Sequence, residues 1–222
     1  MINAEKMRKV VVSALLIIGS VGCVLAQTDA KAKAILAEVS KKYRSYDVIK
    51  TDFTFTLDNP QAKIKETQTG TLYAKSKANK YKIILKKQEL ISDGKSQWTY
   101  LKDDKEVQLS DVDNSPNALN PAQIFTIYEK GFKYVYNGDA KVNNRLVQVI
   151  DLTPLDGKRS FFKVRLNIDK ATKQISNAVI FEKNGNRYTY AIRTFTPNVK
   201  VPESTFAFDS KKYPGVEVVD LR

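Results

Sequence analysis

The side chains that could do chemistry in this chain are almost all carboxylates. The 222 residues include no histidine and a single cysteine, Cys23. The chain therefore lacks the commonest general base, the Ser-His-Asp and Cys-His arrangements, and histidine-containing zinc or iron sites. What remains is carboxylate chemistry, such as the acid pair of a glycosidase. The candidate acids cluster in one segment: Asp103, Asp104, Glu106, Asp111 and Asp113.

This acidic cluster also fits a polar hairpin and loop, and that interpretation predicts no catalysis. The stretch "DVDN" at 111–114 resembles the start of a calcium loop, but the glycine and the terminal glutamate of such a loop are missing. No glycine-rich phosphate loop occurs in the chain either. The residue inventory favours a protein that is not an enzyme and that uses no metal or cofactor.

The first 26 residues have the pattern of a cleavable signal peptide. Three basic residues precede the apolar run "VVVSALLIIGSVG", and small residues stand just before Gln27. That run is too short to span a bilayer comfortably. We therefore predict a signal peptide over 1–26 and a single soluble, exported domain over 27–222.

Cys23 leaves an alternative for the N-terminus. It lies three residues before the predicted cleavage point, so cleavage would remove it and leave a chain without disulfides. It could instead be the acylated cysteine of a lipid-anchored protein. Such a motif usually has leucine three residues before the cysteine, and Ser20 stands there.

The chain is strongly basic, with 37 Lys and Arg against 24 Asp and Glu and a formal net charge of +13. Such a surface attracts anionic partners, namely lipid head groups or acidic protein patches. Export and the lack of a nucleic-acid-binding motif argue against DNA or RNA.

An amphipathic helix is predicted at the start of the mature chain, with Asp29 as its N-cap. Its apolar residues recur at spacings of four and three: Ala32, Leu36, Val39, Tyr43 and Tyr46. The pattern fits a helix over a packed core and a helix over a ligand cavity equally well.

From residue 48 the apolar period changes to two, which indicates about eleven short strands in meander order, the last at 204–209. This reads as one strongly curved antiparallel sheet. Four pairs ending in glycine mark turns: Asp93-Gly94, Asn137-Gly138, Asp156-Gly157 and Asn184-Gly185.

A short helix is predicted to interrupt the meander. Asn120 is its cap, Pro121 its first residue and Gly131 its end. Its apolar side chains cover most of its circumference, so it needs burial on more than one side: Ile124, Phe125, Ile127 and Tyr128.

Large apolar side chains are expected on the concave face of the sheet. Trp98 and Tyr100 stand two apart on one strand and so share a face. Two helices need not fill so wide a concavity, and the unfilled volume would be an apolar pocket. The expected concave set is Phe53, Phe55, Tyr81, Ile83, Leu85, Trp98 and Tyr100.

Several segments in order resemble the periplasmic lipoprotein carriers of the LolA family over nearly all of 29–220. They are "DFTFTL", "GTLYAKSKANKYKI", "LISDGKSQWTY", "NPAQIF" and "STFAFDSKKYPGVEVVDLR". The resemblance implies an unclosed β-barrel with helices as a lid and the acyl chains of lipoproteins as ligand. It also implies a monomer that moves its cargo from an inner-membrane lipoprotein-releasing transporter to an outer-membrane acceptor.

By the same resemblance, an acyl cavity would be lined by Leu36, Val39, Phe53, Phe55, Leu72, Tyr81, Ile83, Leu85, Trp98, Tyr100, Ile124, Phe125 and Tyr128. Family members usually carry Arg-Pro after the second of these strands, and that arginine bonds to the lid. Here the stretch at 75–78 is Lys-Ser-Lys-Ala, so Lys77 is the candidate that closes the lid, without the planar fork of arginine.

Three other readings stay open at this stage. The first is a lipoprotein acceptor or lipid-binding protein anchored through Cys23. The second is a carboxylate-dependent hydrolase of the cell envelope that uses the acidic cluster. The third is a structural sandwich whose core is completely filled.

Overall fold

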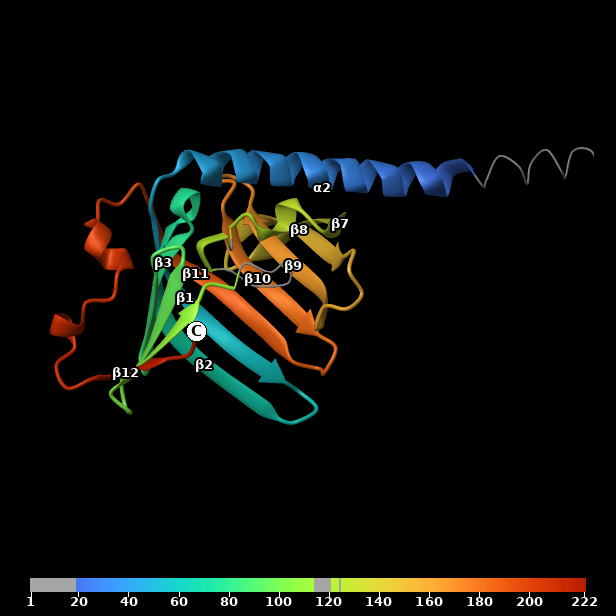
Figure 1. Ribbon diagram of the computed structural model, residues 1–222. Helices are drawn as coiled ribbons and strands as arrows, with labels where there is room; N and C mark the ends of the chain where they lie inside the picture. The colour runs from blue at the N-terminus through green and yellow to red at the C-terminus, as the bar shows by residue number, and fades with distance from the viewer. Residues whose placement is uncertain (1–18, 114–120, 124) are drawn as a thin grey trace, which may run out of the picture.

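The computed structural model describes residues 19–113, 121–123 and 125–222, with one long helix beside a curved sheet (Figure 1). Helix α2 (Gly19–Ser45) begins well before the predicted cap, so Asp29 lies inside it. Its backbone also runs through the predicted cleavage point after Ala26. The predicted signal peptide lies mostly outside the described residues. Within the described chain, no helix has both the length and the apolar character that a bilayer crossing needs.

Twelve strands form one sheet, in the order β12-β6-β5-β4-β3-β2-β1-β11-β10-β9-β8-β7. All neighbours are antiparallel except β12, which runs parallel to β6. The end strands β12 and β7 do not pair, so the barrel is not closed, as predicted. The bounds are β1 (Ile49–Asn59), β2 (Ile64–Lys75), β3 (Lys80–Leu85), β4 (Gln88–Ser92), β5 (Ser96–Leu101), β6 (Glu106–Asp111), β7 (Phe132–Val142), β8 (Arg145–Pro154), β9 (Phe161–Asp169), β10 (Ile175–Glu182), β11 (Arg187–Pro197) and β12 (Glu217–Asp220).

The C-terminal part differs from the prediction. No strand forms at 204–209, where two short 3-10 turns lie instead, η4 (Glu203–Phe206) and η5 (Ser210–Lys212). The last strand is β12, further along the chain. The aromatic residues of this segment pack as single side chains against the sheet, which gives the alternating pattern without strand pairing.

The main core lies between the concave face of the sheet and α2. Ala32, Leu36, Val39 and Tyr43 of the predicted stripe are all buried in it, whereas Tyr46 is half-buried at its edge. The helix is also bonded to the turn between β9 and β10. Its Tyr43 hydroxyl oxygen accepts the backbone N–H of Ile175 at 3.0 Å. The helix therefore has a fixed position on the sheet.

The predicted inserted helix is not continuous. The structure has two 3-10 turns, η2 (Pro121–Gln123) and η3 (Ile127–Glu129), while Asn120 and Ile124 lie outside the described residues. The backbone of Thr126, with φ −132°, is not helical and separates the turns. We call residues 121–123 and 125–129 the inserted segment.

Two of the predicted turns have a different geometry. Asp93 does not have the positive φ of a type I′ turn, and its carboxylate accepts the N–H groups of Lys95 and Ser96 at 2.9 Å each. Asn137-Gly138 is not a turn at all. It lies within β7, where Gly138 with φ +95° accompanies a register shift that marks a bulge.

A second cluster covers the convex face of β3 to β6. Here the C-terminal segment folds back, and Phe206 is buried on it with Ile91 and Val107 of the strands. Glu203 anchors this segment through ion pairs with Lys75 and Lys80. The hydrogen bonds from these two lysines lower the pKa of Glu203 to about 2.

Removing the Phe206 ring should destabilise the whole fold. The side chain is only 1% exposed, so Phe206→Ala is expected to lower the free energy of unfolding by about 3 to 5 kcal/mol. Urea denaturation measures this change. The matched control is Leu221→Ala in the same terminal region, 59% exposed, which should change it by less than about 0.5 kcal/mol. Equal effects of the two variants would contradict a buried C-terminal anchor.

Candidate functional site

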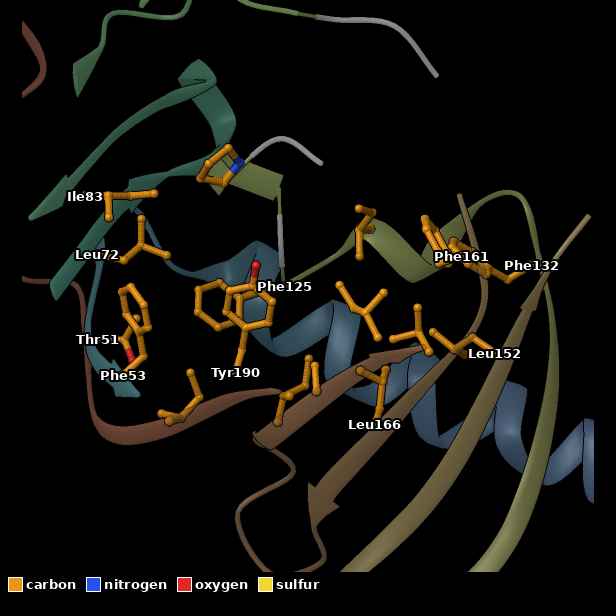
Figure 2. Close-up of a pocket in the computed structure, with 17 residues that line it drawn as sticks. Thr51, Phe53, Leu72, Ile83, Phe125, Phe132, Leu152, Phe161, Leu166 and Tyr190 are labelled. Carbon is orange, nitrogen blue, oxygen red and sulfur yellow. The ribbon is translucent and has the colours of Figure 1, made fainter. Parts of the chain in front are cut away.

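A cavity of about 180 Å³ lies between the concave face of the sheet and the inserted segment (Figure 2). Its walls consist almost entirely of hydrocarbon groups. The hydroxyl of Thr51, which also lines the cavity, donates its hydrogen bond to the Thr194 carbonyl at 2.8 Å. The lining residues are Thr51, Phe53, Leu72, Ile83, Pro121, Phe125, Ile127, Phe132, Leu152, Phe161, Val164, Leu166, Ile175, Ala178, Ile180, Tyr190 and Ile192.

The strand register brings these side chains to one face. Thr51 of β1 lies opposite Leu72 of β2, which lies opposite Ile83 of β3. Phe53 lies opposite Gly70, and a Cβ on that glycine would come within 2.8 Å of the Phe53 ring and 2.6 Å of Leu85. Glycine at this position therefore leaves the ring room to lie flat at the cavity wall.

Across the sheet, the other wall comes from β8 to β11. Leu166 of β9 lies opposite Ala178 of β10, and Ala178 lies opposite Tyr190 of β11. Ala178 is the smallest side chain in the lining. The missing bulk at this position contributes to the open volume.

The inserted segment forms the cover of the cavity, and α2 holds it in place. Phe125 stacks on Tyr43 with ring centroids 4.8 Å apart and an interplanar angle of 11°. The Arg44 guanidinium binds the Glu129 carboxylate through both oxygens, with Nε 2.9 Å from Oε1. The hydrogen bond from Arg44 lowers the pKa of Glu129. The Ser40 hydroxyl also donates to the Tyr128 hydroxyl at 3.2 Å. The cover is therefore tied to the helix by a ring stack, an ion pair and a hydrogen bond.

A further tie joins the cover to the end of β2. The Ser76 hydroxyl donates to the backbone carbonyl of Ala122 at 2.5 Å. Lys77, the predicted lid-closing residue, is exposed beside it and has no hydrogen bond or ion pair to any described residue. The contact between this loop and the cover is therefore made by Ser76 and not by Lys77.

Only four of the predicted lining residues reach the cavity. Phe53, Leu72, Ile83 and Phe125 line it. A second group of four is buried in the main core without reaching the cavity. Phe55 and Leu85 are half-buried and pack at the edge of that core. Ile124 lies outside the described residues. The second group consists of Leu36, Val39, Tyr81 and Tyr128.

Trp98 and Tyr100 are on the other side of the sheet, which corrects the expected concave set. Trp98 lies opposite Ile91, on the convex face, and its ring stacks on Phe208 at 6.3 Å between centroids. Tyr100 meets Tyr213 edge to face at 4.9 Å. Both rings hold the C-terminal segment and do not contact the cavity.

The wall formed by the second half of the chain was not predicted from the sequence. Its apolar residues in β7 to β11 are visible there, but they were not assigned to a face of the sheet. The missed residues are Phe132, Leu152, Phe161, Val164, Leu166, Ile175, Ala178, Ile180, Tyr190 and Ile192.

The acidic cluster lies away from the cavity, whose lining contains no carboxylate. Asp103 is mostly exposed and pairs with Lys87 at 3.4 Å, and Glu106 accepts a hydrogen bond from Gln108 at 2.8 Å. In the described part of the chain, no three His, Cys, Asp or Glu residues come together as a metal site would require.

The sequence matches the family described as "Outer membrane lipoprotein carrier protein LolA" over residues 44–209. The chain belongs to this family. The resemblance found in its motifs is thus confirmed over most of its length.

The structure is similar to several solved structures at low sequence identity, and the first of these shares its fold. An uncharacterized conserved protein from Thermus thermophilus is 16% identical, with a TM-score of 0.54 over 86% of this chain and 99% of that one. LprF from Mycobacterium bovis is 12% identical, with a TM-score of 0.49 over 78% and 96%. A LolA superfamily protein from Nitrosomonas europaea is 10% identical, with a TM-score of 0.44 over 80% and 97%. A comparison with curated protein sequences finds no match.

Breaking the Arg44–Glu129 pair should loosen the inserted segment. With Arg44→Gln, we expect faster hydrogen exchange of the backbone amides at 125–129 at pH 7, as measured by mass spectrometry. The pKa of Glu129 is lowered in the fold, so its contribution is present above the ordinary carboxyl pKa and is lost as the pH falls through the folded value. The difference between variant and wild type should therefore vanish well below pH 4.

Lys41→Gln is the control for this experiment. Lys41 is exposed on the same helix and has no ion pair with a described residue, so its loss should leave exchange at 125–129 unchanged. Identical exchange in wild type and Arg44→Gln at pH 7 would show that the pair does not hold the cover.

Proposed function

We propose that this protein binds the acyl chains of lipoproteins in the cavity and carries them across the periplasm as a non-enzymatic, monomeric carrier. The observation that carries the proposal is an apolar cavity between the concave face and a separately tied cover. Membership of a family described as lipoprotein carriers supports it. The proposed partners are an inner-membrane lipoprotein-releasing transporter, which delivers the cargo, and an outer-membrane acceptor, which receives it.

The physical need for such a carrier is the cost of hydrating an acyl chain. At about 0.8 kcal/mol for each methylene group, one long chain is less stable in water than in an apolar site by roughly 12 kcal/mol. The cavity provides an apolar lining with very few groups that could hydrogen-bond to a ligand. Such a lining accepts chains of different lengths and lets them leave again.

The size of the cavity implies that the cover must move. An engineered apolar cavity of about 150 Å³ holds one benzene molecule. With about 180 Å³, the cavity therefore takes only a short part of a long acyl chain. Displacing the inserted segment from Tyr43 and Arg44 would add the space beneath it.

A hydrolase that uses the acidic cluster receives no support, because none of its carboxylates lines the cavity. A lipid-anchored acceptor remains distinguishable from a shuttle at the N-terminus. Mass spectrometry of the mature protein should find a free chain that begins at Gln27. A diacylglyceryl group on Cys23 would instead assign the acceptor role.

Filling the cavity should weaken acyl binding without unfolding the protein. Ala178→Leu adds three carbon atoms to the lining, at the smallest residue of the wall. The displaced ligand loses the burial of about three methylene groups, so the affinity for a fluorescent fatty-acid probe should fall about fiftyfold. Fluorescence titration of the purified protein measures this change.

The matched control is Ala191→Leu. Ala191 lies opposite Thr54 of β1, on the convex face of the same part of the sheet, and it is half-buried as Ala178 is. This variant should bind the probe as wild type does, and both should keep the wild-type circular dichroism spectrum. Unchanged affinity in a folded Ala178→Leu protein would place the acyl site elsewhere and overturn the proposal.

A further inference from the structure

Three hairpin loops lie together at one end of the sheet. They are residues 60–63, 155–160 and 183–186, and we call them the hairpin rim. Contacts between loops hold them side by side: the Asn59 amide donates to Asn186 at 2.7 Å, and Lys183 Nζ donates to the Gly157 carbonyl at 2.6 Å. In Figure 1, the loops β1–β2 and β10–β11 lie on the side of the sheet away from α2.

Large apolar side chains are exposed at the rim. Leu155 is 61% exposed in its loop. Phe162 and Ile64, in the strands that directly follow two of the loops, are 51% and 43% exposed. Only four other large apolar side chains in the described chain are exposed, and they lie elsewhere. Three such side chains at one end form a feature that the packing of the core does not require.

The rim is also basic. Its three loops contain Lys63, Lys158, Arg159 and Lys183 against a single acid, Asp156. All three lysines are exposed. Exposed leucine and phenylalanine among lysines is the composition of surfaces that lie in the head-group region of a bilayer, because the apolar groups enter the acyl boundary while the cations meet anionic lipids.

One end of the cavity lies directly behind this rim. Phe161, which lines the cavity, is the neighbour of Phe162, and Figure 2 shows it beside Phe132 at one end of the site. The Arg159 guanidinium lies over both rings, 5.0 Å from the Phe132 centroid and 5.5 Å from that of Phe161. A cation and two rings thus separate the cavity from the rim.

We propose that the hairpin rim docks on an anionic lipid bilayer, so that an acyl chain passes between membrane and cavity at the Phe132–Phe161 end. This inference extends the acyl-carrier function proposed above. Docking there spares the chain an aqueous path, since the head-group region and the cavity end meet at Arg159.

The test is flotation of the purified protein with vesicles of phosphatidylcholine and phosphatidylglycerol in a 7:3 ratio, and with phosphatidylcholine alone. The protein should float with the anionic vesicles, less so as salt is raised, and hardly with the neutral ones. The double variant Lys158→Gln/Lys183→Gln should lower the partition coefficient about twenty-five-fold, at about fivefold per lysine. Leu155→Ser/Phe162→Ser should lower it at least tenfold.

Each variant has a control of equal chemistry elsewhere on the surface. Lys33→Gln/Lys41→Gln removes two exposed lysines of α2, and Leu146→Ser/Leu221→Ser removes two leucines that are 49% and 59% exposed. These controls should float as wild type does. No flotation of wild type, or equal losses in control and rim variants, would overturn the docking proposal.

The two proposals fail separately. Binding of the fatty-acid probe is measured without vesicles and does not require the rim. If the probe binds and vesicles do not, the docking proposal is wrong and the carrier proposal stands. If the probe does not bind, the carrier proposal is wrong whatever the vesicles show.

Discussion

The rest of the structure depends on one constraint: the concave face of the sheet is wider than its covering segments can fill. Strands from both halves of the chain turn apolar side chains to one concave face, and a single helix stripe with a short inserted segment cannot fill that space. Packing in protein cores normally leaves few voids larger than a water molecule. An apolar cavity of about 180 Å³ is therefore a specific feature of this fold. Gly70 and Ala178 contribute to it because larger side chains at these positions would occupy the space.

The two faces of the sheet are covered by different segments of the chain. On the convex side, the C-terminal segment is held by buried Phe206, by stacked rings and by Tyr213, whose hydroxyl donates to Glu89 at 3.2 Å. Glu89 is itself paired with Lys82 and Lys102. On the concave side, the inserted segment is held by contacts with α2 and the end of β2, and by the Tyr134 hydroxyl of β7, which donates to the Tyr128 carbonyl. Of the two covering segments, only this one lines the cavity, so in the proposed function it is the one that must move.

Local patterns in the sequence predicted the helix stripe, most strands of the meander, and the positions of Phe53 and Ile83 on the concave face. They were not enough for Trp98, because its face depends on the register of two successive hairpins. The loop at 86–87 sets Ile83 opposite Leu90, and Leu90 lies opposite Thr99, so Trp98 must point the other way. The segment that covers Trp98 is more than a hundred residues away, and no local period reveals such a contact.

The ends of the cavity differ, and this difference orients a bound chain. At one end, Phe125 packs between the rings of Tyr43 and Phe195. At the other end, Phe132 and Phe161 lie beneath Arg159, next to the lysines of the rim. An acyl chain attached to a protein must keep its polar end in water or among head groups. In the proposed function, its terminal methyl group therefore points to Phe125, and the cargo protein remains outside at the rim.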